Sequence, residues 1–141
     1  MNEARTFGVE IEMVVAGNWE GLVASLRKRG LRVNDWLGEG ATKDYWDITE
    51  DGSIESSFGT AAEIRSRILR GARGIEELSL GFEAAAESGS VNRSCGLHVH
   101  IGAEDLTPRG TSCLVDSYKG LQGVINSVMP PSRHYNHYCA P

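Results

Sequence analysis

The sequence predicts an α+β fold, in which helices cover the apolar face of an antiparallel or mixed sheet. Apolar and polar residues alternate over 6–14, 62–68 and 96–102, as they do in half-buried strands. Segments with helical spacing of apolar residues lie between these strands and after the last one. An Asp-Gly step at 51–52 is typical of a hairpin turn. The second face of the sheet is then left to polar side chains.

Length and composition restrict the class of protein. The chain has 141 residues, of which 40% are hydrophobic and 23% charged, so we expect one globular domain rather than a disordered chain. A formal charge of −5 argues against a nucleic-acid partner, and no apolar run is long enough to span a membrane. The three cysteines form no CxxC pair and the N-terminus has no secretory signal pattern. We therefore expect a cytoplasmic protein.

The first half of the chain predicts a strand, a helix and a hairpin. Phe7, Val9, Ile11 and Met13 share one face of the first strand, while Gly8, Glu10 and Glu12 share the other. Asn18 can cap a helix that ends at Gly30. A hairpin turn at Asp51-Gly52 follows residues 45–49, and its two central residues should tolerate positive φ. The stretch 38–40 looks like a loop.

The second half predicts a strand, a helix, a strand and a helix. The strand 62–68 places Glu63, Arg65 and Arg67 on one face. A helix from near Gly74 to Ser88 should bury a stripe made of Ile75, Leu78, Phe82, Ala85 and Ala86. The strand 96–102 follows. The last helix has an apolar side made of Leu114, Tyr118, Leu121, Ile125 and Val128, and Pro130-Pro131 ends it.

Two pairs of side chains on the polar strand faces could carry chemistry. Glu10 and Glu12 lie about 7 Å apart along one strand, and such hard oxygen ligands suit Mg²⁺ or Mn²⁺. His98 and His100 repeat the pattern on another strand and could bind a metal or a phosphate. Considered alone, each pair also has a simpler interpretation as a solvated strand face.

Four motifs in the same order resemble the amidoligase family. They are Phe7-Gly8-Val9-Glu10-Ile11-Glu12, Asp51-Gly52-Ser53-Ile54, Ala62-Glu63-Ile64, and Ser94 to Ile101 with its HVHI ending. The segments Ser132-Arg133 and 135–139 are similar to a stretch that follows the last helix in the family. Amidoligases belong to the carboxylate–amine ligases related to glutamine synthetase and glutamate–cysteine ligase.

The resemblance implies a curved antiparallel sheet with a glutamine synthetase-like catalytic core, and an ATP-dependent ligase that acts through an acyl phosphate. The cofactors would be ATP and Mg²⁺ or Mn²⁺. The metal ligands would be Glu10, Glu12, Glu63 and His98, and the nucleotide contacts would be His98, His100 and Arg65. Glu63 and Arg133 would be the catalytic residues, with Arg133 stabilising phosphate charge. The partners would be small-molecule or peptide carboxylates and amines. The resemblance is also compatible with a homo-oligomer.

By this resemblance we expect the chain to be short for the family and to lack later strands of the sheet. Residues 1–141 would form a single amidoligase-like domain, which leaves three readings open: the N-terminal part of a longer ligase, a half-site completed by a second copy, or a shortened relative that binds without catalysis. A metal-dependent hydrolase using the two glutamates and two histidines is a further alternative. Asp51 is assigned to its turn, and Trp46 to either the core or a ligand contact. The thiols of Cys95, Cys113 and Cys139 are expected to be buried and inert.

Overall fold

The computed structural model describes residues 5–34 and 43–134 and has the expected α+β architecture. The chain divides into two compact units, residues 1–102 and 103–141. The first unit contains the sheet and two helices, and the second contains one long helix. Among the helices described, none combines the length and the hydropathy needed to cross a bilayer.

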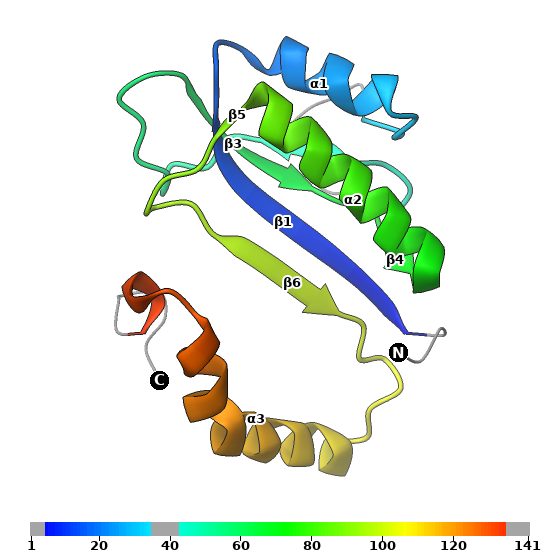
Figure 1. Ribbon diagram of the computed structural model, residues 1–141. Helices are drawn as coiled ribbons and strands as arrows, with labels where there is room; N and C mark the ends of the chain where they lie inside the picture. The colour runs from blue at the N-terminus through cyan, green and yellow to red at the C-terminus, as the bar shows by residue number, and fades with distance from the viewer. Residues whose placement is uncertain (1–4, 35–42, 135–141) are drawn as a thin grey trace. The chain divides into compact units, whose positions relative to one another are not determined.

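The long strand β1 (Thr6–Val15) is the centre of the sheet (Figure 1). Along one edge it pairs with β3 (Thr60–Arg65) and β4 (Leu69–Arg70), and along the other with β6 (Leu97–Ile101) and β5 (Gly89–Ser90). The strand β2 (Asp47–Thr49) extends the sheet beyond β3. All these pairings are antiparallel, which confirms the expected sheet type.

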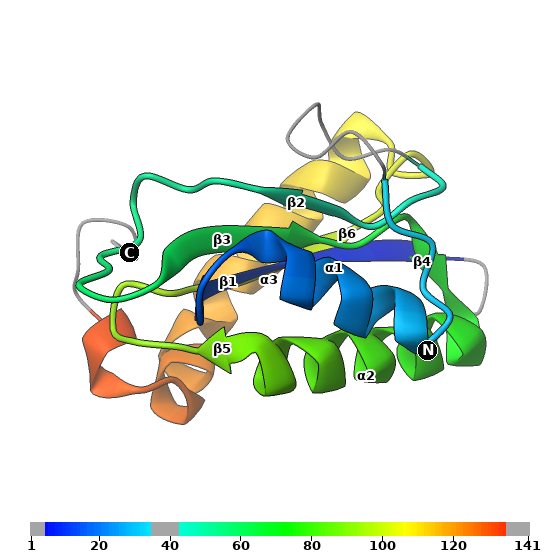
Figure 2. The ribbon, with the colours of Figure 1, turned by 90° about the horizontal axis from the view of Figure 1, so that it is seen from above.

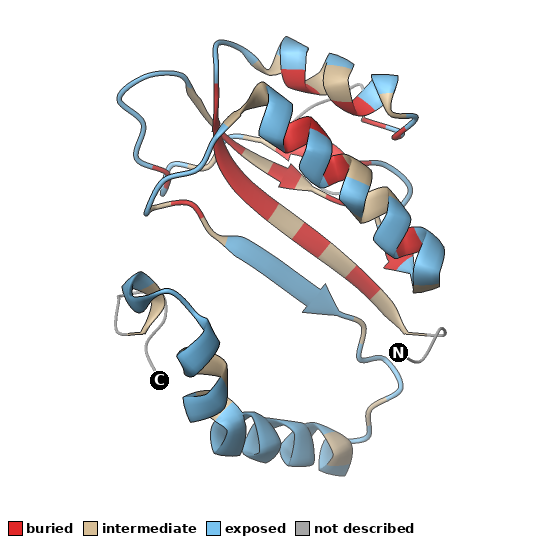
Figure 3. Cartoon of the chain, viewed as in Figure 1, coloured by how far each residue is buried: buried red, intermediate tan, exposed pale blue. Residues whose placement is uncertain are grey.

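The alternation of β1 decides which face holds the core. Its residues alternate between buried and less buried positions along the first part of the strand (Figure 3). The buried apolar residues Val9, Ile11, Met13 and Val15 belong to the main hydrophobic cluster. Glu10 and Glu12 lie on the opposite face, because successive side chains of a strand point to opposite sides. The expected apolar and acidic faces are therefore confirmed.

Helix α1 (Trp19–Lys28) has the predicted boundaries and signals. Asn18 is its N-cap and accepts a hydrogen bond from the backbone N–H of Glu20. Arg27 and Lys28 lie in the last turn, and Gly30 follows with φ of +79°. Its apolar side buries Leu22 and Leu26 completely.

Helix α2 (Gly71–Ser88) lies with α1 on one face of the sheet (Figure 2), and its predicted buried stripe was only partly right: Ala85 is buried and Leu78 is partly buried against the core, as predicted. Ile75 and Phe82 are exposed, whereas Gly74, Gly81, Ala84 and Ala85 are buried. Small residues face the sheet because bulky side chains lie there already. A Cβ atom at Gly81 would lie 2.4 Å from the ring of Trp46, so only glycine permits this approach.

The strand predicted at 62–68 ends earlier than expected, at Arg65. Arg67 therefore does not share a strand face with Glu63 and Arg65. Its guanidinium instead pairs with Glu77 of α2, at 2.5 Å between Nη2 and Oε2. Glu77 also accepts a hydrogen bond from the indole N–H of Trp46, which is fully buried. Trp46 is thus a core residue.

The Asp51-Gly52 step forms a turn, but it is not a tight hairpin. The strands β2 and β3 are joined by residues 50–59, and Ile54 lies outside any strand. Neither Asp51 nor Gly52 has a positive φ, contrary to the prediction. The turn is stabilised instead by the Asp51 side chain, which accepts a hydrogen bond from the backbone N–H of Ser53.

The second unit contains α3 (Pro108–Val128) and the 3-10 helix η1 (Pro131–Arg133). Thr107 caps α3 through its hydroxyl, and the helix ends before Pro130, as predicted. None of the residues of α3 is buried, so the expected burial of the Cys113 thiol was wrong, whereas Cys95 in the first unit is buried as expected. The loop expected at 38–40 and the tail segment 135–139 lie outside the described residues.

Candidate functional site

The polar face of the sheet brings together charged side chains from four strands. Residues paired directly opposite each other share a face, so the register defines two rows. The first row contains His98, Glu10, Arg65 and Asp47, from β6, β1, β3 and β2 in that order. The second contains Glu12, Glu63 and Thr49. Six of the predicted site residues, namely Glu10, Glu12, Glu63, Arg65, His98 and His100, therefore lie on one side of the sheet.

Glu10 is contacted by both histidines of β6. The Nδ1 atom of His98 lies 2.9 Å from Glu10 Oε2, and the Nε2 atom of His100 lies 3.2 Å from Glu10 Oε1. Both histidine side chains are more than half exposed, so they border the site on its solvent side. The HxH spacing matters because it lets two imidazoles reach one carboxylate.

Among the three glutamates predicted as metal ligands, Glu12 is the most deeply buried. Its side chain is 7% exposed, and its Oε2 atom accepts a hydrogen bond of 2.6 Å from the backbone N–H of Gly96. Its Oε1 atom lies 3.4 Å from His98 Nε2. A Cβ atom at Gly96 would lie 3.2 Å from both Glu12 Oε2 and His98 Nε2. Glycine at this position therefore leaves room for the carboxylate and the imidazole.

Glu63 joins two groups of potential metal ligands. Its carboxylate lies near Glu10 and His98, and also near Glu12 and Asp51; within each group the ligand atoms lie within 4.8 Å of one another. The sequence analysis had assigned Asp51 to its turn alone. Its turn position was visible in the sequence, but its approach to Glu12 and Glu63 depends on how residues 50–59 fold back over the sheet.

The pKa directions reflect this crowding. Partial burial raises the pKa of Glu63, and the negative charge of Glu10 raises it further. Partial burial also raises the pKa of Glu10, but hydrogen bonds with His98 and His100 outweigh this effect and leave that pKa below its ordinary value. The hydrogen bond with Glu10 raises the pKa of His98. The site thus holds excess negative charge that favours cations.

Arg65 is the arginine nearest the carboxylates, but its charge is shared with another residue. Its Nη2 atom is bound by Asp47, whose side chain is completely buried in β2. Its Nε atom lies 3.9 Å from Glu63 Oε1 and is buried without a hydrogen-bond partner. The sequence analysis did not predict Asp47 as a residue of this site. The available signal was its position two residues before Thr49 on a short strand, which puts both side chains on the same, polar face.

The donor set fits a hard divalent cation. Carboxylate oxygens predominate, and Mg²⁺ and Mn²⁺ prefer oxygen ligands, with one imidazole acceptable to Mn²⁺. Glu12 supports this fit independently, since a carboxylate buried beside two others needs a compensating positive charge. Glu10, Glu12, Glu63 and His98 are the predicted ligands, and Asp51 adds a fifth.

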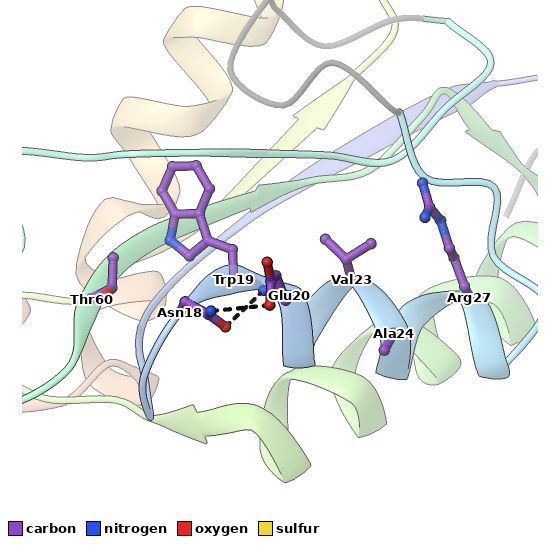
Figure 4. A pocket seen from close by; sticks show the side chains of 7 residues that line it. All are labelled: Asn18, Trp19, Glu20, Val23, Ala24, Arg27 and Thr60. Carbon is purple, nitrogen blue, oxygen red and sulfur yellow. Dashed lines mark hydrogen bonds between the residues drawn. The ribbon is translucent and has the colours of Figure 1, made fainter.

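Two other features are not among these predicted ligands. Arg133 belongs to η1 in the second unit, so its predicted catalytic role stays a prediction. Figure 4 shows an open pocket on α1, lined by Asn18, Trp19, Glu20, Val23, Ala24, Arg27 and Thr60. None of the predicted site residues lines it.

The sheet and its polar face define an α+β protein with a carboxylate-rich site suited to cations. The family model described as "Putative amidoligase enzyme" matches residues 3–141, and the chain belongs to this family. The predicted resemblance is thereby confirmed, and the family points to a ligase-type function. Neither a curated protein nor a solved structure matches the chain.

Proposed function

We propose that the protein is an ATP- and Mg²⁺-dependent carboxylate–amine ligase with a glutamine synthetase-like sheet as its catalytic platform. The observation that carries this proposal is the convergence of Glu10, Glu12 and Glu63 with His98 on one face of the sheet. Family membership supports the ligase class. The site contains more carboxylates than cationic side chains, and this excess of negative charge supports metal binding.

The reaction has two steps whose atoms balance. The oxygen of a substrate carboxylate attacks the γ-phosphorus of ATP, which forms an acyl phosphate and releases ADP. A neutral amine then attacks the acyl carbon, its nitrogen loses one proton to solvent as the amide bond forms, and inorganic phosphate leaves with the C–O bond electrons. A carboxylate needs this activation because it is otherwise a poor acyl donor. Bound divalent cations would neutralise charge on the phosphate oxygens.

The side chains divide this work. Glu10, Glu12, Glu63 and His98 would hold the cations, and the hydrogen bond from Gly96 orients the Glu12 carboxylate. His100 is exposed and lies against Glu10, so it could donate to a phosphate oxygen at the edge of the site. Arg65 and Arg133 are proposed as further phosphate contacts, with Arg133 stabilising the charge of the transferred phosphoryl group.

The proposal is tested first by binding. Thermal unfolding of the full chain is followed with EDTA, Mg²⁺, Mn²⁺ or Zn²⁺, each with and without ATP. Ligands that bind the native state raise the melting temperature. We expect Mg²⁺ or Mn²⁺ to raise it, and ATP to raise it further only when one of these cations is present. A Glu63→Gln variant should lose both shifts, whereas Glu76→Gln on the exposed surface of α2 should keep them.

Turnover is tested with hydroxylamine as the amine, because it traps acyl phosphates as coloured hydroxamates. Hydroxamate and ADP should form in equal amounts when ATP, Mg²⁺ and a mixture of amino acids are supplied. Binding of Mg·ATP without product would indicate a non-catalytic relative. Stabilisation by Zn²⁺ alone would indicate the hydrolase alternative. Either result would contradict the ligase proposal.

A further inference from the structure

The ion pair between Asp47 and Arg65 borders the carboxylate site without belonging to the predicted ligands. Asp47 lies in β2, and its side chain has no exposed surface. The register places Arg65 of β3 between Asp47 on one side and Glu10 on the other. The guanidinium of Arg65 therefore separates the buried carboxylate of Asp47 from the carboxylates that are predicted to bind metal.

The Arg65 guanidinium forms fewer hydrogen bonds with the neighbouring carboxylates than its position would allow. Arginine normally forms short, often bidentate hydrogen bonds with nearby carboxylates. Here Nη2 is bound by Asp47, whereas Nε stays 3.9 Å from Glu63 Oε1 and has no hydrogen-bond partner despite being buried. The pairing with Asp47 thus fixes the guanidinium short of a hydrogen bond with Glu63.

Stability alone is a weak explanation for such a pair. The cost of removing two charges from water often equals or exceeds their mutual attraction, so apolar replacements of buried ion pairs are frequently neutral or stabilising. An effect on the neighbouring carboxylates accounts for the pair more directly. If Arg65 were released from Asp47, its guanidinium could form hydrogen bonds with Glu63 or Glu10. It would then replace the positive charge that a metal ion brings to the site.

We propose that Asp47 is a positioning residue that holds Arg65 away from Glu10 and Glu63, and so keeps these carboxylates available to a divalent cation. The inference rests on the proposed function, since it assumes a cation site on this face. It assigns Asp47 a role that acts through Arg65 and requires no contact between Asp47 and the metal or substrate.

Mn²⁺ binding without nucleotide tests the proposal, and isothermal titration of the full chain measures it. We expect Asp47→Asn to weaken Mn²⁺ binding at least tenfold, because the freed Arg65 occupies the site. The double variant Asp47→Asn/Arg65→Met should bind Mn²⁺ within about threefold of the wild type or more tightly. This rescue distinguishes a positioning role from a general loss of structure, which a second substitution would not repair.

The pair formed by Arg67 and Glu77 supplies a matched control. This pair also joins an arginine next to the sheet, just after β3, to a partly buried carboxylate. It involves none of the predicted metal ligands. Glu77→Gln should therefore leave Mn²⁺ affinity unchanged. Unchanged affinity in Asp47→Asn would overturn the inference while the cation site stands. If that variant does not fold, weaker binding by the double variant than by the wild type would overturn it.

Absence of Mn²⁺ binding in the wild type would overturn the proposed cation site and this inference together. The two failures are therefore distinguishable: one is seen in the wild type, and the other only in the variants.

Discussion

Replacement of Glu12 by glutamine should make the metal-free protein more stable and remove its response to cations. Glu12 is almost completely buried beside Asp51 and Glu63. Glutamine keeps the side-chain oxygen that accepts the hydrogen bond from Gly96, but it removes the negative charge. Alanine would be a poorer test, because it would leave the Gly96 N–H without its acceptor.

The size of the effect follows from the spacing of the carboxylates. Ligand oxygens of Glu12, Asp51 and Glu63 lie within 4.8 Å of one another. Two unit charges at such a separation repel by about 3 kcal/mol at an effective dielectric constant of about 20. Solvent around these partly exposed side chains reduces this repulsion. We expect the free energy of unfolding of Glu12→Gln in EDTA to rise by about 1–2 kcal/mol.

Thermal and urea unfolding in EDTA and in saturating Mn²⁺ measure this change. Each kcal/mol corresponds to about 4–8 °C in melting temperature for a unit of this size. In Mn²⁺ the order should reverse, since the wild type gains about 2.7 kcal/mol at a hundredfold excess over Kd. Glu76→Gln, with the same charge change on the exposed surface of α2, should show neither effect. A Glu12→Gln variant that is less stable than the wild type in EDTA, or that responds equally to Mn²⁺, would refute the reasoning.

Two further predictions concern the core and the histidine contact. In a urea titration, Gly81→Ala should lower the free energy of unfolding by about 1–2 kcal/mol, because the added Cβ would lie 2.4 Å from the buried ring of Trp46. The control is Gly21→Ala in α1, where no heavy atom lies within 4 Å of the added Cβ. This variant should be as stable as the wild type or more stable. Equal stability of the two variants would contradict the packing of α2. NMR titration in EDTA should give His98 a pKa above its ordinary value of 6.5, which falls in Glu10→Gln because that variant removes the negative charge of the hydrogen-bond partner. Since the pKa is raised on folding, the stability that His98 contributes is fully present below pH 6.5 and is lost as the pH rises through the folded value. The stability difference between the wild type and His98→Gln should follow this course, and a difference that grows with pH would contradict it.

Local patterns were sufficient for the main helices, for β1 and β6, and for most of the proposed ligands. The alternation in β1 placed Glu10 and Glu12 on the polar face, because side chains of a strand point to opposite sides at every step. The Asn18 cap and Gly30 fixed the ends of α1, since these signals depend only on neighbouring backbone groups. The two histidines of β6 were recognised in the same way.

Contacts between distant segments could not be predicted from such patterns. The register that places Glu63 opposite Glu12 and Asp47 opposite Arg65 depends on how three strands pair across the sheet. The approach of Asp51 to the carboxylates depends on the path of residues 50–59. The buried side of α2 was misassigned at Ile75 and Phe82 for a related reason. Trp46 fills the space that larger helix residues would need at Gly81, so small residues face the sheet there. Sequence periodicity determines which face of an element each side chain occupies, and tertiary packing decides which faces meet and how closely.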